Sequence, residues 1–403
     1  MGRLSTSQSI LIMKNKYLYK LGKGIILMAS LFVTINATAQ QPANTYSIKS
    51  WWGPPPPKFS PVVNTDGSIT FRVKAPKAHT VNLLFGEWDI KPQAFQKDTG
   101  DVWMLTIAPV QPGIYSYVFS IDGVQTLDMM NPVTKIGTQI YSSVVEVPGT
   151  PARFDELQNV PHGVMQIWRY FSTPLKRTRG LNVYLPQQYF SEPKRKFPVL
   201  YLRHGGGDDE TSWTQPAGSA NIILENLIAQ HKAMPMIIVM TNGLTDGTWA
   251  GGSTSQAMNA LEQELMTEVI PLVEKSYRVL PGRNNRAITG LSMGGGQAFV
   301  MGLRNLDKFA WVGEFSAGLL SDKDFNVDVL LPGVMTANNL NNKLKLFWIG
   351  CGTDDPRYPG HRLLVDQLNK RGIHNEFHDT PGGHEWKVWR TELQGFMQKI
   401  FRQ

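Results

Sequence analysis

The feature that most constrains the fold is a serine set between glycines in the stretch Gly290-Leu291-Ser292-Met293-Gly294. A strand-like run enters this stretch and a helix-compatible segment leaves it. In a strand–turn–helix context, such a serine adopts a strained backbone that brings together the positions two before and two after it. Gly290 and Gly294 occupy these positions, where side chains would clash. The stretch predicts a nucleophile elbow, and its alternative is an ordinary glycine- and serine-rich turn.

The first 39 residues have the pattern of a secretory signal peptide. Four lysines between positions 14 and 23 precede an uncharged apolar run, residues 25–35, and Ala37-Thr38-Ala39 forms a cleavage site. The apolar run is too short for a membrane anchor, because spanning a bilayer takes about 20 residues. We therefore expect residues 1–39 to be removed before Gln40 and the mature protein to be periplasmic or secreted.

Charge and cysteine content exclude several classes of protein. Without the leader, which carries Arg3 and four lysines, the chain has 35 basic and 32 acidic residues. No Lys/Arg cluster remains, so we expect no nucleic-acid partner. We expect no membrane association after cleavage either, because the cleavage point lacks the cysteine that a lipid anchor needs. Cys351 is the only cysteine, which rules out an intramolecular disulfide, and the oligomeric state is not predicted.

Short β-type segments alternate with turns after a stiff proline stretch at residues 54–57. Two of the turns are Asp66-Gly67 and Asp122-Gly123. The expected strands are 68–73, 80–85, 102–107, 113–121 and 142–147. Short strands at this spacing predict an immunoglobulin-like β-sandwich in a first domain, residues 40–150.

The same segment, from Phe59 to Val147, resembles carbohydrate-binding module family 48, the N-terminal module of isoamylases and glycogen-branching enzymes. The residues that carry this resemblance are Trp88, Asp101-Val102-Trp103, 112–117, 119–123, Asp128 and Asn131-Pro132. The resemblance implies aromatic rings that could stack on sugars. Packing in the core or between domains is the alternative for the same rings, and we predict no specific sugar ligands in this module.

The pattern changes after residues 148–151, where uninterrupted apolar strands begin to alternate with helices. Such a pattern predicts a mostly parallel sheet covered on both faces. The expected strands are 197–202, 236–240, 286–290, 310–315, 344–350 and 375–379, with an antiparallel pair at 163–171 and 178–185. The expected helices are 219–230, 257–277, 359–371 and 387–401. The fold class is therefore α/β, with an α/β-hydrolase domain spanning residues 151–403 after the β-sandwich.

Candidate partners for Ser292 follow it in the chain at the ends of two predicted strands. A serine hydroxyl needs an adjacent base, and the base needs an orienting acid. In an α/β-hydrolase domain the order is serine, acid, histidine, and ligand-facing loops lie at the carboxyl ends of the strands. His384, in a glycine-rich loop, is the predicted base. Asp355 is the predicted acid, and its neighbour Asp354 is the alternative.

The predicted oxyanion hole needs two backbone N–H groups aimed at the developing alkoxide. Met293, directly after the serine, supplies one of them. The other is expected from Gly206 in the stretch His204-Gly205-Gly206-Gly207, where glycines allow the backbone to approach a substrate carbonyl. His204 is expected to hold this loop by hydrogen bonding. No Cys/His spacing indicates a metal, so neither a metal nor an organic cofactor is predicted.

The second domain resembles the secreted feruloyl and acetyl-xylan esterases of carbohydrate esterase family 1, which are relatives of esterase D. The residues that carry this resemblance are 201–207, 211–213, 264–265, 270–274, 277–279 and 285–295. Carried over by position, it implies Ser292 as nucleophile, Asp355 as acid and His384 as base. It also implies Gly206 and Met293 as the oxyanion donors. Arg203 departs from the family pattern. We expect it to form a salt bridge with a nearby acid, and a preference for an acidic substrate group is the alternative.

The combination of both domains resembles rumen and gut bacterial enzymes that remove ferulate from arabinoxylan. It implies an exported serine esterase that acts through an acyl-enzyme on plant cell-wall xylan, with feruloyl favoured over acetyl. Trp213, Trp249 and Trp386 lie in loops around the expected site, where they either contact a phenolic ring or sugar or pack the loops. The alternatives are a siderophore esterase of the enterochelin type and a carbohydrate-binding protein without catalysis.

Overall fold

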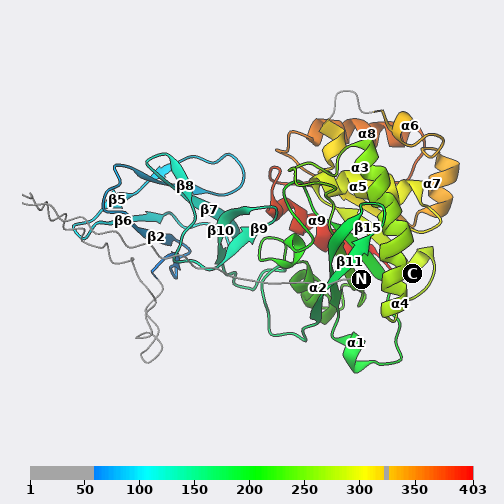
Figure 1. Ribbon diagram of the computed structural model, residues 1–403, viewed down its shortest axis with the longest axis horizontal. Coiled ribbons are helices and arrows are strands. Elements are labelled where there is room, and N and C mark those ends of the chain that lie inside the picture. Colours follow the sequence, from blue (N-terminus) through cyan, green and yellow to red (C-terminus); the bar gives the residue numbers. More distant parts are fainter. Residues whose placement is uncertain (1–58, 322–325, 403) are drawn as a thin grey trace, which may run out of the picture. The chain divides into compact units, whose positions relative to one another are not determined.

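The computed structural model describes residues 59–321 and 326–402, and its elements are shown in Figure 1. Residues 56–403 form one compact unit. It contains an N-terminal β-sandwich followed by an α/β sheet, which confirms the predicted fold class. The predicted leader, residues 1–39, and the proline stretch at 54–57 lie outside the described residues. The domain boundary at residues 150 and 151 stays a prediction.

The β-sandwich consists of two antiparallel sheets with a shared apolar core. One sheet has the strand order β1-β2-β6-β5, and the other β4-β3-β7-β10-β9, with β8 paired to β7. The bounds are β1 (Val62–Val63), β2 (Ile69–Lys74), β3 (Val81–Phe85), β4 (Gln93–Ala94), β5 (Gln96–Lys97), β6 (Val102–Ile107), β7 (Gly113–Ile121), β8 (Val124–Thr126), β9 (Thr134–Ile136) and β10 (Ile140–Val147). Phe71 of one sheet packs edge-on against Tyr117 of the other, with 4.8 Å between ring centroids.

Three of the residues that carry the resemblance to the carbohydrate-binding module are buried in this core. Trp103 is buried, and its indole N–H donates to the Ala75 carbonyl at 2.9 Å. Asp128 accepts the Tyr117 hydroxyl at 2.9 Å, and Asn131 donates to that same hydroxyl at 3.0 Å. These side chains stabilise the sandwich itself, so the packing alternative holds for the ring of Trp103.

The third sheet, which follows the sandwich in the chain, has eight strands in the order β11-β12-β14-β13-β15-β16-β17-β18. β12 pairs antiparallel with β11 and β14, and the strands from β14 to β18 are parallel. The strand bounds are β11 (Val164–Ser172), β12 (Arg177–Leu185), β13 (Val199–Arg203), β14 (Ile237–Thr241), β15 (Arg286–Gly290), β16 (Trp311–Phe315), β17 (Leu346–Gly352) and β18 (Glu376–Thr380). The helix bounds are α1 (Gln188–Ser191), α2 (Ala220–Ala229), α3 (Ser255–Glu264), α4 (Ile270–Ser276), α5 (Ser292–Arg304), α6 (Val327–Leu330), α7 (Ala337–Lys343), α8 (Tyr358–Lys370) and α9 (Trp386–Lys399).

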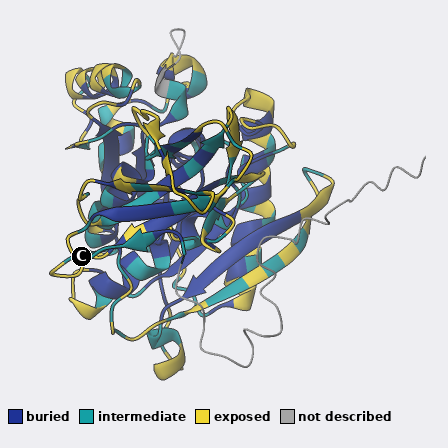
Figure 2. Ribbon diagram, turned by 90° about the vertical axis from the view of Figure 1, so that its left-hand side faces the viewer, coloured by how far each residue is buried: buried dark blue, intermediate teal, exposed yellow. Residues whose placement is uncertain are grey.

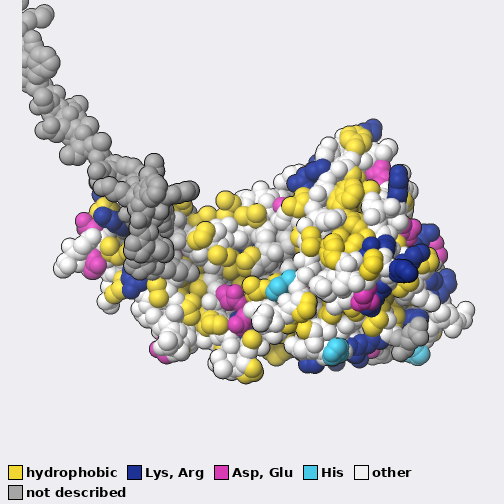
Figure 3. Space-filling view, turned by 90° about the horizontal axis from the view of Figure 1, so that it is seen from below, with side chains coloured by type: hydrophobic (Ala, Val, Ile, Leu, Met, Phe, Trp, Pro, Cys, Tyr) yellow, Lys and Arg dark blue, Asp and Glu magenta, His cyan; other side chains and the backbone are white. Residues whose placement is uncertain are grey.

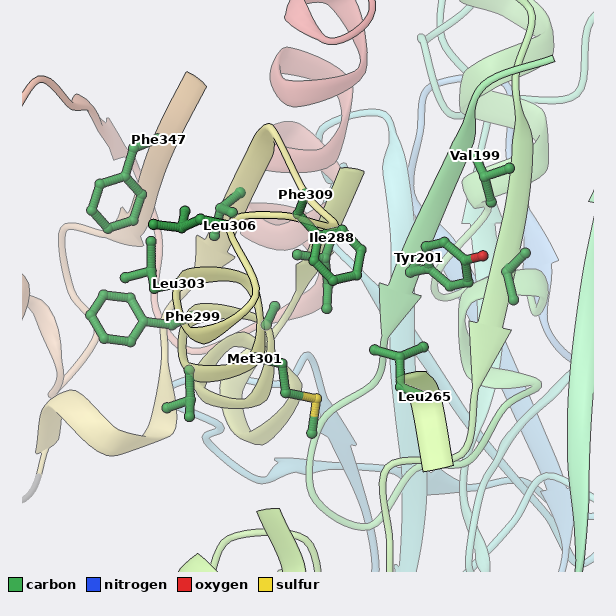
Figure 4. Packing of buried hydrophobic residues seen from close by; sticks show 14 of the residues in the cluster. Val199, Tyr201, Leu265, Ile288, Phe299, Met301, Leu303, Leu306, Phe309 and Phe347 are labelled. Atoms are coloured by element: carbon green, nitrogen blue, oxygen red, sulfur yellow. The ribbon is translucent and has the colours of Figure 1, made fainter. Parts of the chain in front are cut away.

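Alternate residues of each strand enter different apolar clusters, because successive side chains point to opposite faces of a sheet. Val199 and Tyr201 pack with residues of α3, α4, α5 and α8 on one face. Figure 4 shows part of this cluster from close by, including both residues and side chains of α5. Leu200 and Leu202 pack with residues of α2 and α9 on the other face. Burying both faces explains why these strands are apolar throughout, and Figure 2 shows the buried strands inside helices that are exposed on their outer sides.

The long helix predicted at residues 257–277 is interrupted by a wide turn. Between α3 and α4 the backbone forms a π-helical turn, Leu265–Val269, and Pro271 is the second residue of α4. Proline has no amide N–H and its ring crowds the preceding turn, so a regular α-helical ladder is broken here. The periodicity of apolar residues continues through the turn, which is why the sequence predicts a single helix.

The surface carries charges of both signs. On the face seen in Figure 3, Lys and Arg side chains form separate groups with acidic, polar and apolar side chains around them. Among the helices of the described residues, none combines the length and the apolar character that crossing a membrane requires.

We predict that the elbow tolerates no side chain at Gly294. A Cβ added there would lie 2.2 Å from the His204 carbonyl oxygen and 2.8 Å from the Arg203 carbonyl carbon. Because both neighbours are backbone atoms, Gly294→Ala should destabilise the fold by about 3 kcal/mol in urea unfolding. Gly247→Ala is the control, since an added Cβ there meets nothing within 4 Å. Equal unfolding midpoints for the two variants would contradict this account of the turn.

A second prediction concerns Glu392 of α9, which is 1% exposed. Burial raises the pKa of Glu392 to about 7, although hydrogen bonds from the Thr380 hydroxyl and the Trp348 indole oppose this shift. Between its ordinary pKa of 4.5 and 7, the folded chain keeps a proton that the unfolded chain loses. Stability should therefore fall as pH rises through this window and stop falling above it, by about 3 kcal/mol in total.

The isosteric Glu392→Gln variant isolates this effect. It carries no titrating proton, so its stability relative to the wild type should rise between pH 5 and pH 8. Urea unfolding of both proteins at the two pH values measures this difference. Parallel pH dependences would show that Glu392 does not titrate in this range.

Candidate active site

The elbow between β15 and α5 holds Ser292 in a strained conformation. Its φ angle is +50°, a value that side-chain-bearing residues rarely adopt. Gly290 and Gly294 meet at the base of the turn, where a Cβ on Gly290 would lie 2.6 Å from the Gly294 carbonyl oxygen. Ser292 itself is 4% exposed and begins α5. The glycines are thus required by the close backbone approach that the sequence predicts.

His384 and Asp355 form a hydrogen-bonded row with Ser292. His384 Nε2 lies 2.9 Å from Ser292 Oγ, and His384 Nδ1 lies 2.6 Å from Asp355 Oδ2. Of the two adjacent acids, Asp355 is buried and contacts the histidine, whereas Asp354 is exposed. The structure therefore brings together all three side chains that the sequence proposes, and it distinguishes between the two acids.

These side chains meet because three strands end at the same edge of the sheet. Ser292 follows β15, Asp355 follows β17 and His384 follows β18. The strands are parallel, so their carboxyl ends lie side by side. Gly352 at the end of β17 pairs with Thr380 at the end of β18, which aligns the two loops.

The Asp355 carboxylate is surrounded by groups that favour its charged form. Burial by itself would raise its pKa, but the hydrogen bond and charge of His384, the Arg357 amide N–H and the Ser316 hydroxyl hold the pKa of Asp355 below its ordinary value. The Arg357 N–H donates to Asp355 Oδ1 at 2.9 Å. A carboxylate that stays ionised can hold the imidazole in one orientation and stabilise its protonated form.

Arg357 was not singled out by the sequence, yet it touches the histidine. One guanidinium nitrogen, Nη1, lies 3.2 Å from His384 Nδ1 and 3.4 Å from Nε2. Similar distances to both ring nitrogens place this nitrogen over the ring. It also lies 3.8 Å from Asp355 Oδ1. The only signal in the sequence is its position two residues after Asp355.

A second acid–imidazole pair lies behind the first. Glu314 and His361 are fully buried, and His361 Nε2 lies 3.2 Å from Glu314 Oε2. Burial alone would lower the pKa of His361, but the charge of Glu314 and a hydrogen bond with Cys351 raise it well above its ordinary value. His361 Nδ1 donates to the Arg357 carbonyl at 2.8 Å and so holds the turn that presents Asp355. Sequence reasoning gave His361 no role.

The loop with the expected oxyanion donor is held by His204. Its Nδ1–H donates to the Gly205 carbonyl at 2.8 Å, and its Nε2 accepts the Gly243 N–H at 2.7 Å. Burial lowers the pKa of His204 to about 4, so the ring is neutral and can donate and accept at once. Within residues 59–321 and 326–402, the amide N–H groups of Gly206 and Met293 donate to no backbone carbonyl, and Gly206 lines the cavity described below.

The expectation that Arg203 forms a salt bridge with a nearby acid is wrong. Arg203 is 2% exposed and forms no salt bridge with any carboxylate of the described residues. The nearby Glu264 is already paired with Arg179 at 3.0 Å. Arg203 instead donates to Gln297 Oε1 at 2.6 Å and to Thr241 Oγ1 at 3.0 Å. Burial lowers the pKa of Arg203 to about 10, and its contacts tie β13 to α5 beneath the elbow.

A cavity of about 360 Å³ has Ser292, His384 and Gly206 in its wall. Residues of the β-sandwich complete this wall, among them Lys135 and Tyr141. No group of three His, Cys, Asp or Glu side chains is placed to hold a metal ion in the part of the chain that the structure describes.

The three tryptophans expected around the site differ in position. Trp249 is 58% exposed and lines the cavity, and Trp386 also lines it although it is mostly buried. Trp213 does not line it. Its side chain is 1% exposed, donates its indole N–H to the Arg203 carbonyl at 3.0 Å and packs edge-on against Trp386. Of the two alternatives that the sequence leaves open for Trp213, the structure therefore favours packing of the loops over contact with substrate.

Comparisons with known proteins agree with this geometry. The model of the Esterase family matches residues 172–400. The endo-1,4-beta-xylanase/feruloyl esterase of Xylanibacter ruminicola is 32% identical over 350 residues, which cover 85% of this chain and 46% of that protein. Esterase Rv1288 of Mycobacterium tuberculosis is 24% identical over 61% of each chain. This chain thus spans 46% to 61% of the length of these curated relatives.

Two solved structures illustrate the fold. A ferulic acid esterase that is 28% identical covers 60% of this chain and 98% of its own, with a TM-score of 0.50. The enterobactin esterase FES from Shigella flexneri, crystallised in the presence of 2,3-dihydroxy-N-benzoyl-glycine, is 18% identical and covers 87% of this chain and 97% of its own, with a TM-score of 0.62. The second likeness extends beyond the α/β sheet into the β-sandwich, and it concerns the fold alone.

Matched substitutions of the adjacent residues Asp355 and Asp354 test which of them is the acid that orients His384. Asp355→Asn should lower kcat for ester hydrolysis by about 10³- to 10⁴-fold, because the amide no longer fixes the imidazole or stabilises its charged form. Asp354→Asn should leave kcat within about twofold, since its side chain is exposed. Steady-state kinetics on one soluble ester compares them, and a loss confined to the Asp354 variant would reverse the assignment.

Proposed function

Because the chain belongs to the Esterase family, we propose that it is a serine carboxylic-ester hydrolase that releases feruloyl groups from plant cell-wall xylan. The observation that carries the proposal is the row Ser292–His384–Asp355, joined by hydrogen bonds of 2.9 Å and 2.6 Å in the wall of a cavity. A nucleophile, a base and an orienting acid at these distances are what acyl transfer requires.

In the first half of the reaction, Ser292 Oγ attacks the ester carbonyl carbon while His384 Nε2 takes the hydroxyl proton. The carbonyl oxygen becomes an alkoxide that the amide N–H groups of Gly206 and Met293 stabilise. Such donors are each worth about 10²- to 10³-fold in kcat. The tetrahedral intermediate then expels the sugar alkoxide, which receives its proton from His384, and the acyl group remains on Ser292.

In the second half, water attacks the acyl carbonyl and gives a proton to His384. The same two amides hold the alkoxide. When the intermediate collapses, Ser292 Oγ leaves with the proton from His384 and the free acid departs. Asp355 keeps its charge throughout and holds the imidazole through Nδ1–H, because its pKa lies below the ordinary value.

Two observations support an aromatic acyl group. The relative from Xylanibacter ruminicola is named a feruloyl esterase and shares 32% identity over 85% of this chain. The cavity wall includes the rings of Trp249, Trp386 and Trp389 close to Ser292. Indole faces and edges pack well against planar phenolic rings. Acetyl is the alternative acyl group. It is less favoured, because an acetyl group would leave these rings without an aromatic partner.

The proposal also includes export and the xylan chain as the carrier of the ester. Export is supported by the leader pattern in residues 1–39, and xylan by the same relative, which is named as a xylanase as well as a feruloyl esterase. A catecholate siderophore ester is the second candidate substrate, since the likeness to the enterobactin esterase extends over 87% of this chain.

A substrate panel tests the function. The wild type should hydrolyse methyl ferulate and feruloylated arabinoxylan oligosaccharides faster than acetylated xylan or a catecholate siderophore, as measured by chromatography of the released acids. Ser292→Ala should lose at least about 10³-fold on every ester of the panel. Full activity of this variant would remove Ser292 from the mechanism, and preference for the siderophore would replace the proposed substrate.

A further inference from the structure

Two loops of the α/β domain carry groups that must not move during the reaction. The oxyanion loop, residues 204–208, contains Gly206, and the histidine loop, residues 381–386, contains His384. Both loops are rich in glycine, which gives a chain little stiffness of its own. Each of them is in contact with side chains of the β-sandwich.

The oxyanion loop is bonded to the hairpin formed by β9 and β10. The carbonyl oxygen of Gly207, the residue after the expected donor, accepts the Thr138 amide N–H at 2.9 Å. The hydroxyl oxygens of Thr138 and Tyr141 each lie 2.9 Å from the same carbonyl oxygen. Gly207 has a φ of +74°, and a Cβ there would lie 2.4 Å from the Tyr141 hydroxyl. The sandwich therefore reaches the backbone next to Gly206.

An ion pair strengthens this contact. Lys135 Nζ of β9 lies 2.5 Å from Asp208 Oδ1, and the two side chains are 13% and 5% exposed. Lys135 also lies over the Tyr141 ring, 4.7 Å from its centroid. Breaking a charge pair that is so little exposed is costly, because the partner that remains would be buried and unpaired. The oxyanion loop and the hairpin are thus held together.

The histidine loop is held by a different part of the sandwich, the turn after β3. Glu87 Oε2 accepts the Trp386 amide N–H at 2.9 Å, at the start of α9. Glu87 Oε1 accepts the Ser116 hydroxyl of β7 at 2.7 Å, which fixes the carboxylate from behind. The ring of Trp88 packs on Gly383, where a Cβ would lie 2.4 Å from Trp88 Cδ2. His384 is bracketed by these two contacts.

From these contacts we propose that the β-sandwich is a positioning element of the catalytic centre. It clamps the oxyanion loop through Tyr141 and Thr138 and the histidine loop through Glu87 and Trp88. These four side chains are positioning residues that do not touch the reacting atoms. They act by holding Gly206 and His384 in place. The proposal rests on the proposed esterase function, and it gives the sandwich a role in the chemical step for every ester.

The alternative role for the sandwich is binding of the polymer alone. A module that only retains polysaccharide changes activity on xylan and leaves small soluble esters unaffected. A clamp changes kcat on any ester, because a displacement of about 1 Å at a catalytic group can cost 10²-fold in rate. A small ester such as p-nitrophenyl acetate therefore distinguishes the two roles.

The test uses single substitutions in the full chain, each of which removes one hydrogen bond between the sandwich and a loop. Tyr141→Phe removes a hydroxyl, and Glu87→Ala removes the acceptor for Trp386. Each should lower kcat on p-nitrophenyl acetate by about 5- to 50-fold with KM changed less than about twofold. Glu87→Gln should restore kcat to within about twofold, because its amide can accept from the Trp386 N–H and donate to the Ser116 hydroxyl.

Controls separate positioning from loss of folded protein. Met129→Ala changes a sandwich side chain that is 84% exposed and should leave kcat unchanged. The concentration of active sites is titrated with a fluorophosphonate in every sample, so that kcat refers to folded enzyme alone. The rate of this labelling is a second readout, and it should fall with kcat in Tyr141→Phe and Glu87→Ala.

Each outcome has a distinct meaning. Wild-type kcat and labelling rate in Tyr141→Phe and Glu87→Ala, with losses on xylan only, would overturn the clamp and leave the esterase intact. Equal losses of kcat in Glu87→Ala and Glu87→Gln would also overturn the clamp, because the hydrogen bonds that Gln keeps with Trp386 and Ser116 would then have no effect on the rate. A wild type without activity on any ester would overturn the proposed function, and the clamp with it.

Discussion

The hydrogen bond between His384 and Ser292 is the interaction on which the rest of the site depends. It joins residues that are 92 positions apart in the chain, at a distance of 2.9 Å. Nothing local fixes that distance. It results from the pairing of parallel strands, which brings the ends of β15, β17 and β18 to one edge, and from the turn that forces Ser292 to a φ of +50°. The apolar clusters on both faces keep this edge in place.

Buried polar and charged side chains next to the site hold Asp355 and His384 in position. Asp355 orients His384, the Arg357 N–H orients Asp355, and His361 holds the Arg357 carbonyl while paired with Glu314. Each of these hydrogen bonds joins a donor to an acceptor, while the buried Glu314 Oε1 and Arg357 Nε have no hydrogen-bond partner among the described residues. Hydrogen bonds between buried groups are electrostatically stronger than the same bonds in water. The orientation of the His384 imidazole therefore depends on a series of contacts that runs through Asp355 and Arg357 to the buried pair of His361 and Glu314.

Sequence reasoning could find what depends on local pattern. The parallel strands were located to within about two residues, since fully buried strands form continuous apolar runs. Ser292, His384 and Asp355 were identified because strand ends and glycine-rich turns mark them. Reasoning failed where packing across the chain decides the outcome. Trp213 is buried against Trp386, and Arg203 finds Gln297 because Arg179 already occupies Glu264. The pair of Glu314 and His361 comes from β16 and α8, and no spacing in the sequence connects them.

The Ser292–His384–Asp355 row lies at the edge of the α/β sheet, and side chains of the sandwich contact the loops beside it. The proposed function depends above all on Ser292 being an activated nucleophile. The most direct measurement is mass spectrometry of the protein after reaction with a fluorophosphonate, which labels activated serines. We predict one adduct per chain, located on the peptide that contains Ser292, with esterase activity lost in proportion and no labelling of a His384→Ala variant. An adduct on another residue, or full activity after complete labelling of Ser292, would contradict the account.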